Sequence, residues 1–316
     1  MSKSEVAVDY PAGRSQMIAR SGNPVLQKLR ERLIESGMFL CAVFSVAVTA
    51  GIVWVLVYES WNFFRHVSIV DFLTDTQWTV LFENPRYGIM PLITGTLVTS
   101  VIALLVALPL GTTIAIYLSE YANPSVREVL KPILELLSAV PTVVFGYFAL
   151  LFITPLLQNL LPDLPGFNML SAGIVIGIMI VPYVSSLSED AMKAVPVPIR
   201  EGSYAMGATR LQTALRVLMP AAFSGIASAY VLGFSRAIGE TMVVALAAGT
   251  QPNLTINPME GAATITAYIV QVSLGDLPHG SIAYQSIFAA GLTLMVMTLL
   301  FNIGGYFLRK RFREIY

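Results

Sequence analysis

The sequence predicts an all-α membrane protein with six transmembrane helices, because its composition is strongly apolar and it contains six long apolar segments. Of the 316 residues, 55% are hydrophobic and only 12% are charged, and the mean hydropathy is +0.71. A soluble domain carries about 25% charged residues, so this apolar excess requires lipid as the surrounding solvent. The formal net charge is zero, which leaves no electrostatic basis for binding nucleic acid.

Each of the six segments is long enough to cross a bilayer, which takes about 20 residues of helix. Pro141 and Pro182 interrupt the third and fourth segments and predict kinks there. Gly173 and Gly177 form a GxxxG pattern in the fourth, which allows close helix packing. Residues 261–274 are apolar but too short to cross, so a re-entrant or interfacial helix is expected rather than a seventh span. The predicted spans are residues 38–58, 89–118, 134–157, 169–187, 221–248 and 282–308.

The basic residues lie mostly on one predicted side of the membrane. Sixteen of the nineteen Lys and Arg residues fall in the N-terminal segment, in the loops after the second and fourth spans, or in the C-terminal tail. Only Arg65 and Arg86 lie in the opposite loops, and Arg236 lies inside a span. Because loops rich in Lys and Arg stay in the cytoplasm, both termini are expected to be cytoplasmic.

The spans divide the chain into four parts. Residues 1–36 form a predicted cytoplasmic tail, with a short amphipathic helix at 27–35 that is expected to lie at the membrane interface. Residues 37–88 supply the first span and an extracytoplasmic loop. Residues 89–309 form a core of five spans with a cytoplasmic loop at 190–220, and residues 310–316 form a second cytoplasmic tail.

Few side chains in this sequence suggest metal or redox chemistry. The single cysteine, Cys41, excludes an internal disulfide and a cysteine metal site. His66 and His279 lie in separate loops and are expected to be solvated rather than to share a metal ion. The aromatic residues of the first extracytoplasmic loop suit the outer headgroup level of the bilayer. These aromatic residues are Trp61, Phe63, Phe64, Trp78 and Tyr87.

The loop between the fourth and fifth spans has the composition of two short helices around a glycine turn. Two prolines favour the start of a helix over 197–206, and Gly207 breaks it. Thr209 suits the N-cap of a second helix over 210–219, which is expected to end at Pro220. From the residues alone, this loop is either an ordinary interfacial connection or a docking unit for another protein.

This loop resembles the EAA loop of ABC importer permeases. The pattern is Glu201-Gly202-Ser203, then Gly207, then Leu218-Met219-Pro220, with Gly and Ser in place of the two alanines and Met in place of the leucine. The resemblance implies a coupling helix that sits in a groove of an ATP-hydrolysing subunit. The residues expected to make this contact are Glu201, Gly202, Ser203, Ala205 and Gly207.

The resemblance extends beyond this loop. From about residue 89 onward, the order of spans is similar to the type I (MetI-like) ABC importer permease core, and residues 108–121, LPLGTTIAIYLSEY, resemble its first core motif. The sequence contains no GxxxxGK[ST] phosphate-binding loop. The resemblance therefore implies a transport subunit rather than an enzyme. Such a subunit binds no cofactor itself, and ATP and Mg²⁺ are bound by a separate ATPase subunit.

Two further motifs resemble the C-type permease of the phosphate-specific Pst importers. They are residues 138–146, SAVPTVVFG, and residues 233–241, GFSRAIGET. The A-type permease has a related arginine segment, so the choice between C-type and A-type stays open. The resemblance implies import of inorganic phosphate by a heterodimer of permeases in a bacterial plasma (inner) membrane. It also implies two ATP-binding subunits and an extracytoplasmic phosphate-binding protein as partners.

Arg236 and Glu240 are the only ionisable residues well inside a predicted span. They are four residues apart, which places them on one face of a continuous helix, and a charge at a helix centre costs roughly 2.5–3.5 kcal/mol on insertion scales. They are therefore expected to face away from lipid, either as a structural ion pair or along a water-filled path. The family resemblance favours the path, with Ser235 and Thr241 beside it.

The chemistry of an arginine suits a phosphate ion. Its planar guanidinium donates two parallel hydrogen bonds and stays charged. Glu240 is expected to hold Arg236 when the path is empty, and to release it as phosphate passes.

Other charged groups have plainer interpretations. Glu189 and Asp190 are expected at a solvated helix end, and Lys131 and Glu135 are expected to form a helical pair at the interface. Two other functions stay open beside phosphate import: an ABC permease for another small solute, and an ion-coupled secondary transporter or channel. Secondary transporters often contain two related halves, and we find no internal repeat in this sequence.

Overall fold

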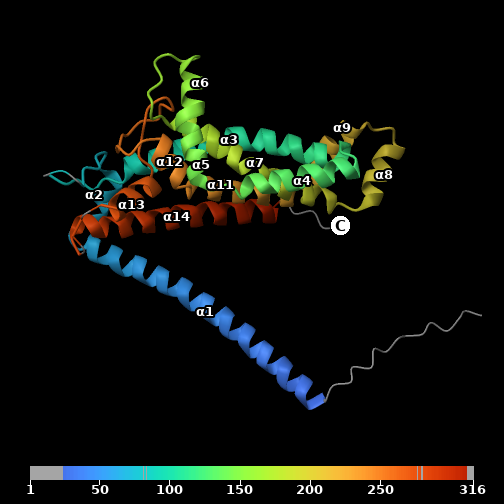
Figure 1. Cartoon of the computed structure of the whole chain (residues 1–316), viewed down its shortest axis with the longest axis horizontal. Helices are drawn as coiled ribbons and strands as arrows, with labels where there is room; N and C mark the ends of the chain where they lie inside the picture. Colours follow the sequence, from blue (N-terminus) through green and yellow to red (C-terminus); the bar gives the residue numbers. More distant parts are fainter. Residues whose placement is uncertain (1–23, 81, 83, 276, 279, 312–316) are drawn as a thin grey trace, which may run out of the picture. The chain divides into compact units, whose positions relative to one another are not determined.

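Helices make up most of the chain in the computed structural model, which describes residues 24–311 except 81, 83, 276 and 279 (Figure 1). The predicted tails therefore lie largely outside the described residues. Within those residues there is no β-strand, only a bridge between Trp78 and Tyr87. The chain divides into two units, Met1–Trp54 and Val55–Tyr316.

The described part of the first unit belongs to one long helix, α1 (Pro24–Phe64), whose last turns extend into the second unit. Residues 27–35 are helical as predicted, but they are continuous with the first span instead of forming a short helix of their own. Between that segment and the apolar stretch the only poor helix former is Gly37, and one glycine costs only about 1 kcal/mol in a helix.

The core of the second unit is built on two helices, α3 (Met90–Ile116) and α7 (Met169–Lys193). α11 (Phe223–Ile238) packs against both, and α14 (Ile282–Arg311) runs beside α11 (Figure 1). The GxxxG prediction is confirmed, because a Cβ atom on Gly177 would lie 2.7 Å from the carbonyl oxygen of Ala103 on α3. Pro182 does not interrupt α7, which continues to Lys193.

Two bent helix pairs complete the set of spans. The first consists of α4 (Pro124–Ser138), followed after Pro141 by α5 (Thr142–Phe148), the π-helical turn η2 (Ala149–Ile153) and α6 (Thr154–Gln158). Its two halves differ in direction by 87°, as the interruption at Pro141 predicts. The second pair joins Arg210–Ala221 to Phe223–Ile238 at 78°. The described helices include four that are long and apolar enough to cross a membrane, and six if each bent pair counts as one span.

Different short helices lie at the two ends of the second unit (Figure 1). One end holds α2 (Ile69–Thr74) and α13 (Ile265–Ser273), and the other holds α8 (Val197–Ala205) and α9 (Arg210–Thr213). α13 is short and largely buried, and its Ile265 amide donates to Thr96 Oγ1 of α3 at 3.0 Å. As predicted, residues 261–274 do not form a seventh span.

The aromatic loop near α2 packs inward instead of presenting its rings to headgroups. Phe63 and Trp78 are buried, and Trp78 meets the ring of Tyr268 edge-on at 4.9 Å between centroids. Of the five predicted aromatics, Trp61 is clearly exposed. The correction has a simple cause, because edge-to-face packing with Phe72 and Tyr268 gives these rings an apolar partner within the protein.

The loop between α7 and α11 has the predicted helix, turn and second helix. Thr209 caps α9 in a capping box with Gln212, and Gly207 adopts φ +82°, a conformation that glycine tolerates best. The second helix continues past Pro220 through η3 (Ala214–Leu218) and α10 (Met219–Ala221). The helix therefore ends one residue later than the predicted end at Pro220, because proline at an early helical position needs no hydrogen-bonded N–H.

Candidate functional site

Arg236 lies in the last turn of α11 and faces α7. Its guanidinium carbon lies 4.7 Å from the centroid of the Tyr183 ring, a cation–π contact. Its Nε atom is buried and has no hydrogen-bond partner within the described residues. Stacking on an aromatic face shields the guanidinium from the apolar surroundings and leaves its donors free. Such a group is ready to bind an anion.

Tyr183 also lines a cavity of about 190 Å³ between α4 and α7. Glu135 and Ser138 come from α4, and Ser186 comes from α7 one helical turn after Pro182. Arg236 does not line this cavity itself, and the Tyr183 ring is the contact that relates the guanidinium of α11 to it. No pattern along the chain indicated Tyr183, because only the packing of α11 on α7 brings it to Arg236.

Glu240 does not share a helix face with Arg236, contrary to prediction. α11 ends at Ile238, and α12 (Met242–Ala247) begins after Gly239 and Glu240. The Glu240 carboxylate accepts hydrogen bonds from the Met242 and Val243 amides at 3.1 and 3.4 Å. Within the described residues no ion pair joins Arg236 to Glu240.

The physical reason is local competition for the carboxylate. A helix start has unpaired amides and a positive dipole end, both of which favour a carboxylate. α11 ends just before Gly239 and α12 begins at Met242, so the predicted span 221–248 is broken there. The backbone oxygen of Glu240 also accepts from Thr266 Oγ1 at 2.6 Å, which fixes the break against α13.

The two hydroxyl residues predicted beside the path differ in their contacts. Ser235 Oγ donates to Val231 O and to Asn302 Oδ1 of α14, each at 3.0 Å. Its hydroxyl is thus directed to α14, whereas Arg236 is stacked on α7. Thr241 Oγ1 donates to Gly239 O at 3.3 Å, at the break between α11 and α12. The structure brings neither hydroxyl into contact with the Arg236 guanidinium.

The predicted coupling residues lie together on and after α8, and most are exposed. Glu201, Gly202 and Ala205 are exposed, and a Cβ atom on Gly202 would meet nothing within 4 Å. Ser203 instead faces inward, where its Oγ lies 2.8 Å from Thr213 Oγ1 of α9. Gly207 is exposed in the turn. α8 therefore presents one face to solvent and is fixed to α9 on another.

Glu189 is not at a solvated helix end, contrary to prediction. Its side chain is fully buried and pairs with Arg127 and Lys131 of α4 and with Lys193 of α7. Lys131 also lies 2.7 Å from Asp190, so it pairs with α7 rather than with Glu135 as predicted. The cluster arises because α4 crosses the end of α7.

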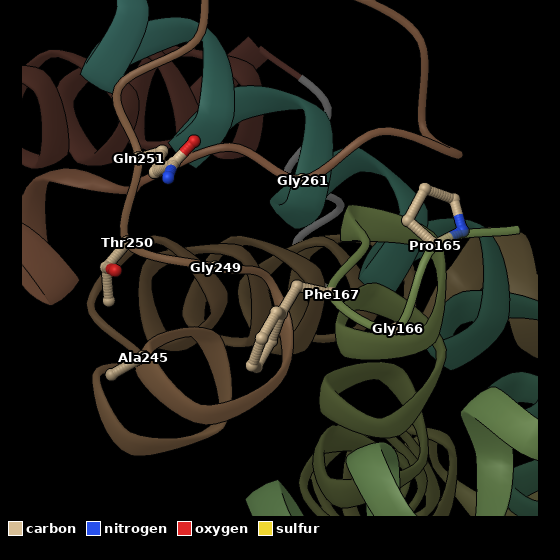
Figure 2. Close-up of a pocket in the computed structure, with 8 residues that line it drawn as sticks. All are labelled: Pro165, Gly166, Phe167, Ala245, Gly249, Thr250, Gln251 and Gly261. Atoms are coloured by element: carbon tan, nitrogen blue, oxygen red, sulfur yellow. The ribbon is translucent and has the colours of Figure 1, made fainter.

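A larger pocket of about 460 Å³ lies near the C-terminal end of α12 (Figure 2). Its walls come from the loop before α7, from α12 and from the loop after α12, and Figure 2 shows the Phe167 side chain among the lining residues. None of its lining residues is charged, and none is a predicted path residue, so it offers no counter-charge for an anion. The lining residues are Pro165, Gly166, Phe167, Ala245, Gly249, Thr250, Gln251 and Gly261.

Comparison with known proteins agrees with this architecture. Residues 107–314 match the family model described as binding-protein-dependent transport system inner membrane component. The probable ABC transporter permease protein YqgH of Bacillus subtilis is 35% identical over 94% of this chain and 95% of its own length. The phosphate transport system permease protein PstC 1 of Mycobacterium tuberculosis is 34% identical over 74% of this chain and 80% of its own length.

A solved structure extends the likeness to the fold. A chain of a bacterial alginate ABC transporter, crystallised in complex with an alginate pentasaccharide-bound periplasmic protein, matches with a TM-score of 0.61 and 17% identity, over 92% of this chain and 98% of that chain. The predicted type I permease fold is thereby confirmed, and the apolar helices make the chain a multi-pass protein of the inner membrane. The chain belongs to the family of binding-protein-dependent transport system inner membrane components, as a permease subunit of an ABC importer.

Proposed function

We propose that this permease imports inorganic phosphate, as the C-type subunit of a heterodimer with an A-type permease. Relatives named as phosphate permeases, among them the mycobacterial PstC 1, support the choice of cargo. The observation that carries the proposal is the Arg236 guanidinium, stacked on Tyr183 with a buried and unpartnered Nε. A rigid fork of donors in a site of low dielectric suits a tetrahedral oxyanion.

The proposed passage uses Arg236 as a transient ligand. Phosphate reaches the guanidinium, accepts two parallel hydrogen bonds and leaves toward the cytoplasm when the helices change their packing. A single cation binds the anion weakly enough for release. Glu240 caps α12 and so leaves Arg236 free of a carboxylate partner. The carboxylate beside this region is that of Glu135, which lines the Tyr183 cavity and would help to expel the anion.

The proposal includes separate subunits for energy and for capture. Both termini and α8 face the cytoplasm, where the exposed side of α8 docks on one of two ATP-binding subunits. ATP and Mg²⁺ bind to those subunits, and this chain binds no cofactor. An extracytoplasmic phosphate-binding protein delivers the ion at the opposite end, near α2 and α13. The solved alginate transporter, with its periplasmic protein bound, supports this arrangement by analogy.

The test is phosphate uptake by the reconstituted complex. Arg236→Gln keeps a polar, hydrogen-bonding side chain but loses the charge. Hydrogen bonds to charged groups contribute about 1.5–3 kcal/mol, so uptake is expected to fall roughly ten- to a hundredfold. Arg236→Lys keeps the charge without the planar fork of donors. Its uptake is expected to lie between that of the wild type and that of Arg236→Gln. Arg65→Gln removes an exposed arginine of the outer loop and serves as the control, with uptake unchanged.

Three results would contradict the proposal. Normal uptake by Arg236→Gln, in membranes where assembly is verified, removes Arg236 from the path. Stimulation of ATP hydrolysis by another solute and its binding protein, with no response to phosphate, makes the chain an ABC permease for that solute. Uptake without any ATPase subunit would instead indicate a secondary transporter or a channel.

A further inference from the structure

A buried carboxylate lies where α3 meets the coupling loop. Glu120 belongs to the π-helical turn η1 (Tyr117–Tyr121), which directly follows α3, and its side chain is only 3% exposed. Its Oε1 lies 3.2 Å from Arg200 Nη2, and its Oε2 accepts a hydrogen bond from the Tyr204 hydroxyl at 2.9 Å. Both partners belong to α8. The only other contact described for the carboxylate is Ser119 Oγ, at 3.1 Å from Oε1.

The spacing of the two α8 residues explains this contact. Arg200 and Tyr204 are four apart, so they project from one face of the helix. The guanidinium and the carboxylate form an ion pair without an aligned hydrogen bond, since Arg200 Nη2 has no hydrogen-bond partner of good geometry. Burial, together with the bond to Glu120, raises the pKa of the Tyr204 phenol, which therefore stays protonated as a donor.

The remaining faces of α8 are free or fixed to α9. Gly202 is exposed, with open space around a built Cβ, whereas Ser203 is fixed to Thr213 of α9. The helix is thus held to α3 by Glu120 and to the base of α11 by the α9 segment. A partner that displaced α8 would pull on both supports.

A hydrogen bond continues the connection from α3 toward Arg236. The hydroxyls of Thr112 on α3 and Tyr230 on α11 lie 2.6 Å apart. Tyr230 precedes Arg236 by six residues on the same helix. Polar contacts of this kind between packed apolar helices resist sliding, because an unpaired buried group costs more than the bond gains.

We propose that Glu120 is the joint that transmits displacement of α8 to α3, and through Thr112 and Tyr230 to the helix of Arg236. This inference rests on the proposed role of α8 as the docking helix. Without the joint, α8 can follow the ATPase while α3 stays in place. Hydrolysis then continues with little transport. The joint is a positioning residue and does not touch the transported ion.

The experiment measures coupling separately from assembly. The complex is reconstituted in liposomes, and three quantities are recorded: ATPase subunits retained per permease, ATP hydrolysed, and phosphate imported per ATP. We expect Glu120→Gln to keep assembly and hydrolysis but to lower import per ATP about tenfold, because it loses an ion pair and weakens a hydrogen bond. Tyr204→Phe is expected to lower the same ratio about threefold. Glu128→Gln, which alters an exposed carboxylate of α4, is the matched control.

Hydrogen exchange at residues 117–121 gives a second readout that does not depend on the cargo. In the wild-type complex, binding of a nonhydrolysable ATP analogue should change amide exchange at α8 and at η1. In Glu120→Gln the change at η1 should be lost while that at α8 remains. A purely structural role would instead lower assembly and hydrolysis together.

The outcomes separate this inference from the proposed function. The proposed role of Glu120 is contradicted if Glu120→Gln imports as much phosphate per ATP as the wild type. It is also contradicted if the ATP analogue changes amide exchange at η1 in Glu120→Gln as it does in the wild type. If Glu120→Gln fails to assemble, a wild-type ratio in Tyr204→Phe overturns it equally. If the wild-type complex moves no phosphate, the proposed cargo is wrong, and the joint is still scored by the exchange response. If the wild-type permease binds no ATPase subunit, the docking role fails first and the joint fails with it.

Discussion

A carboxylate buried among apolar helices is stable only when its charge is balanced, and Glu189 meets this condition with three cations. Arg127 and Lys131 approach from α4, and Lys193 approaches from the same helix. Removing one partner of a buried pair leaves an uncompensated charge, which is far more costly than losing an exposed pair. The cluster therefore fixes the end of α4 on the end of α7.

Glu189→Ala is expected to destabilise the permease strongly. Three cations, which are 23–33% exposed, would then lie together without Glu189, and the expected loss is at most about 3–5 kcal/mol because water screens part of their repulsion. The measurement is the midpoint of thermal unfolding of the purified permease in detergent. Adding Arg127→Gln to Glu189→Ala removes one of the three cations and should restore part of the lost midpoint. The matched control is Asp190→Asn, since Asp190 is 56% exposed and contacts the same Lys131. That exposed pair contributes at most about 1 kcal/mol, so an equal fall in both midpoints would contradict this account.

At the scale of helices, the apolar segments predicted the spans because lipid leaves the backbone no other way to satisfy its hydrogen bonds. α3, α7 and α14 begin within one residue of their predicted starts. The prediction failed where side chains decide the local path. Nothing in the spacing of Arg236 and Glu240 reveals that Glu240 prefers the free amides of α12 to the guanidinium. A glycine followed by a carboxylate was the available signal for that helix start.

Burial at helix ends was equally inaccessible to sequence reasoning. Glu189 was expected to be solvated because its own segment ends there, yet α4, which is 62 residues away at Arg127, covers it. Tyr183 belongs to the site for a similar reason, because only the packing of α11 places Arg236 over its ring. Patterns along the chain predict which segments are helical. They do not predict which helices cross.

The packing of α3 on α7 should fail when Gly177 gains a methyl group. The new Cβ would lie 2.7 Å from both the Ala103 carbonyl oxygen and Val106 Cβ, and the backbone oxygen cannot move without moving α3. Gly177→Ala is expected to cost about 1–3 kcal/mol by overpacking, measured as a lower unfolding midpoint in detergent. Gly304→Ala on α14 is the control, since a Cβ there meets nothing within 4 Å. An unchanged midpoint for Gly177→Ala would show that α3 can shift at little cost.

At the scale of the whole molecule, the proposed docking of α8 on an ATPase subunit accounts for the composition of its exposed side. Small side chains at Gly202 and Ala205 keep the helix surface flat, and Met206 beside them is 88% exposed. A fold that needed only a connection between α7 and α11 would gain nothing from this arrangement. The absence of a phosphate-binding loop in the sequence agrees with a partner that supplies the energy.

Substitution at Gly202 should therefore separate folding from assembly. Gly202→Leu adds a side chain into open space, so the unfolding midpoint of the permease alone is expected to stay the same or rise slightly, because glycine is a poor helix former. In the complex, the same side chain would hold the ATPase subunit away from the α8 backbone. Retention of the ATPase subunit on the permease should fall at least about tenfold, a loss of roughly 1.4 kcal/mol in binding free energy. Gly202→Ala, with one methyl group, should give a smaller loss in the same assay. A leucine at the centre of a close helix contact cannot be accommodated without separating the two backbones. Full retention of the ATPase subunit by Gly202→Leu would therefore show that the docking surface lies elsewhere.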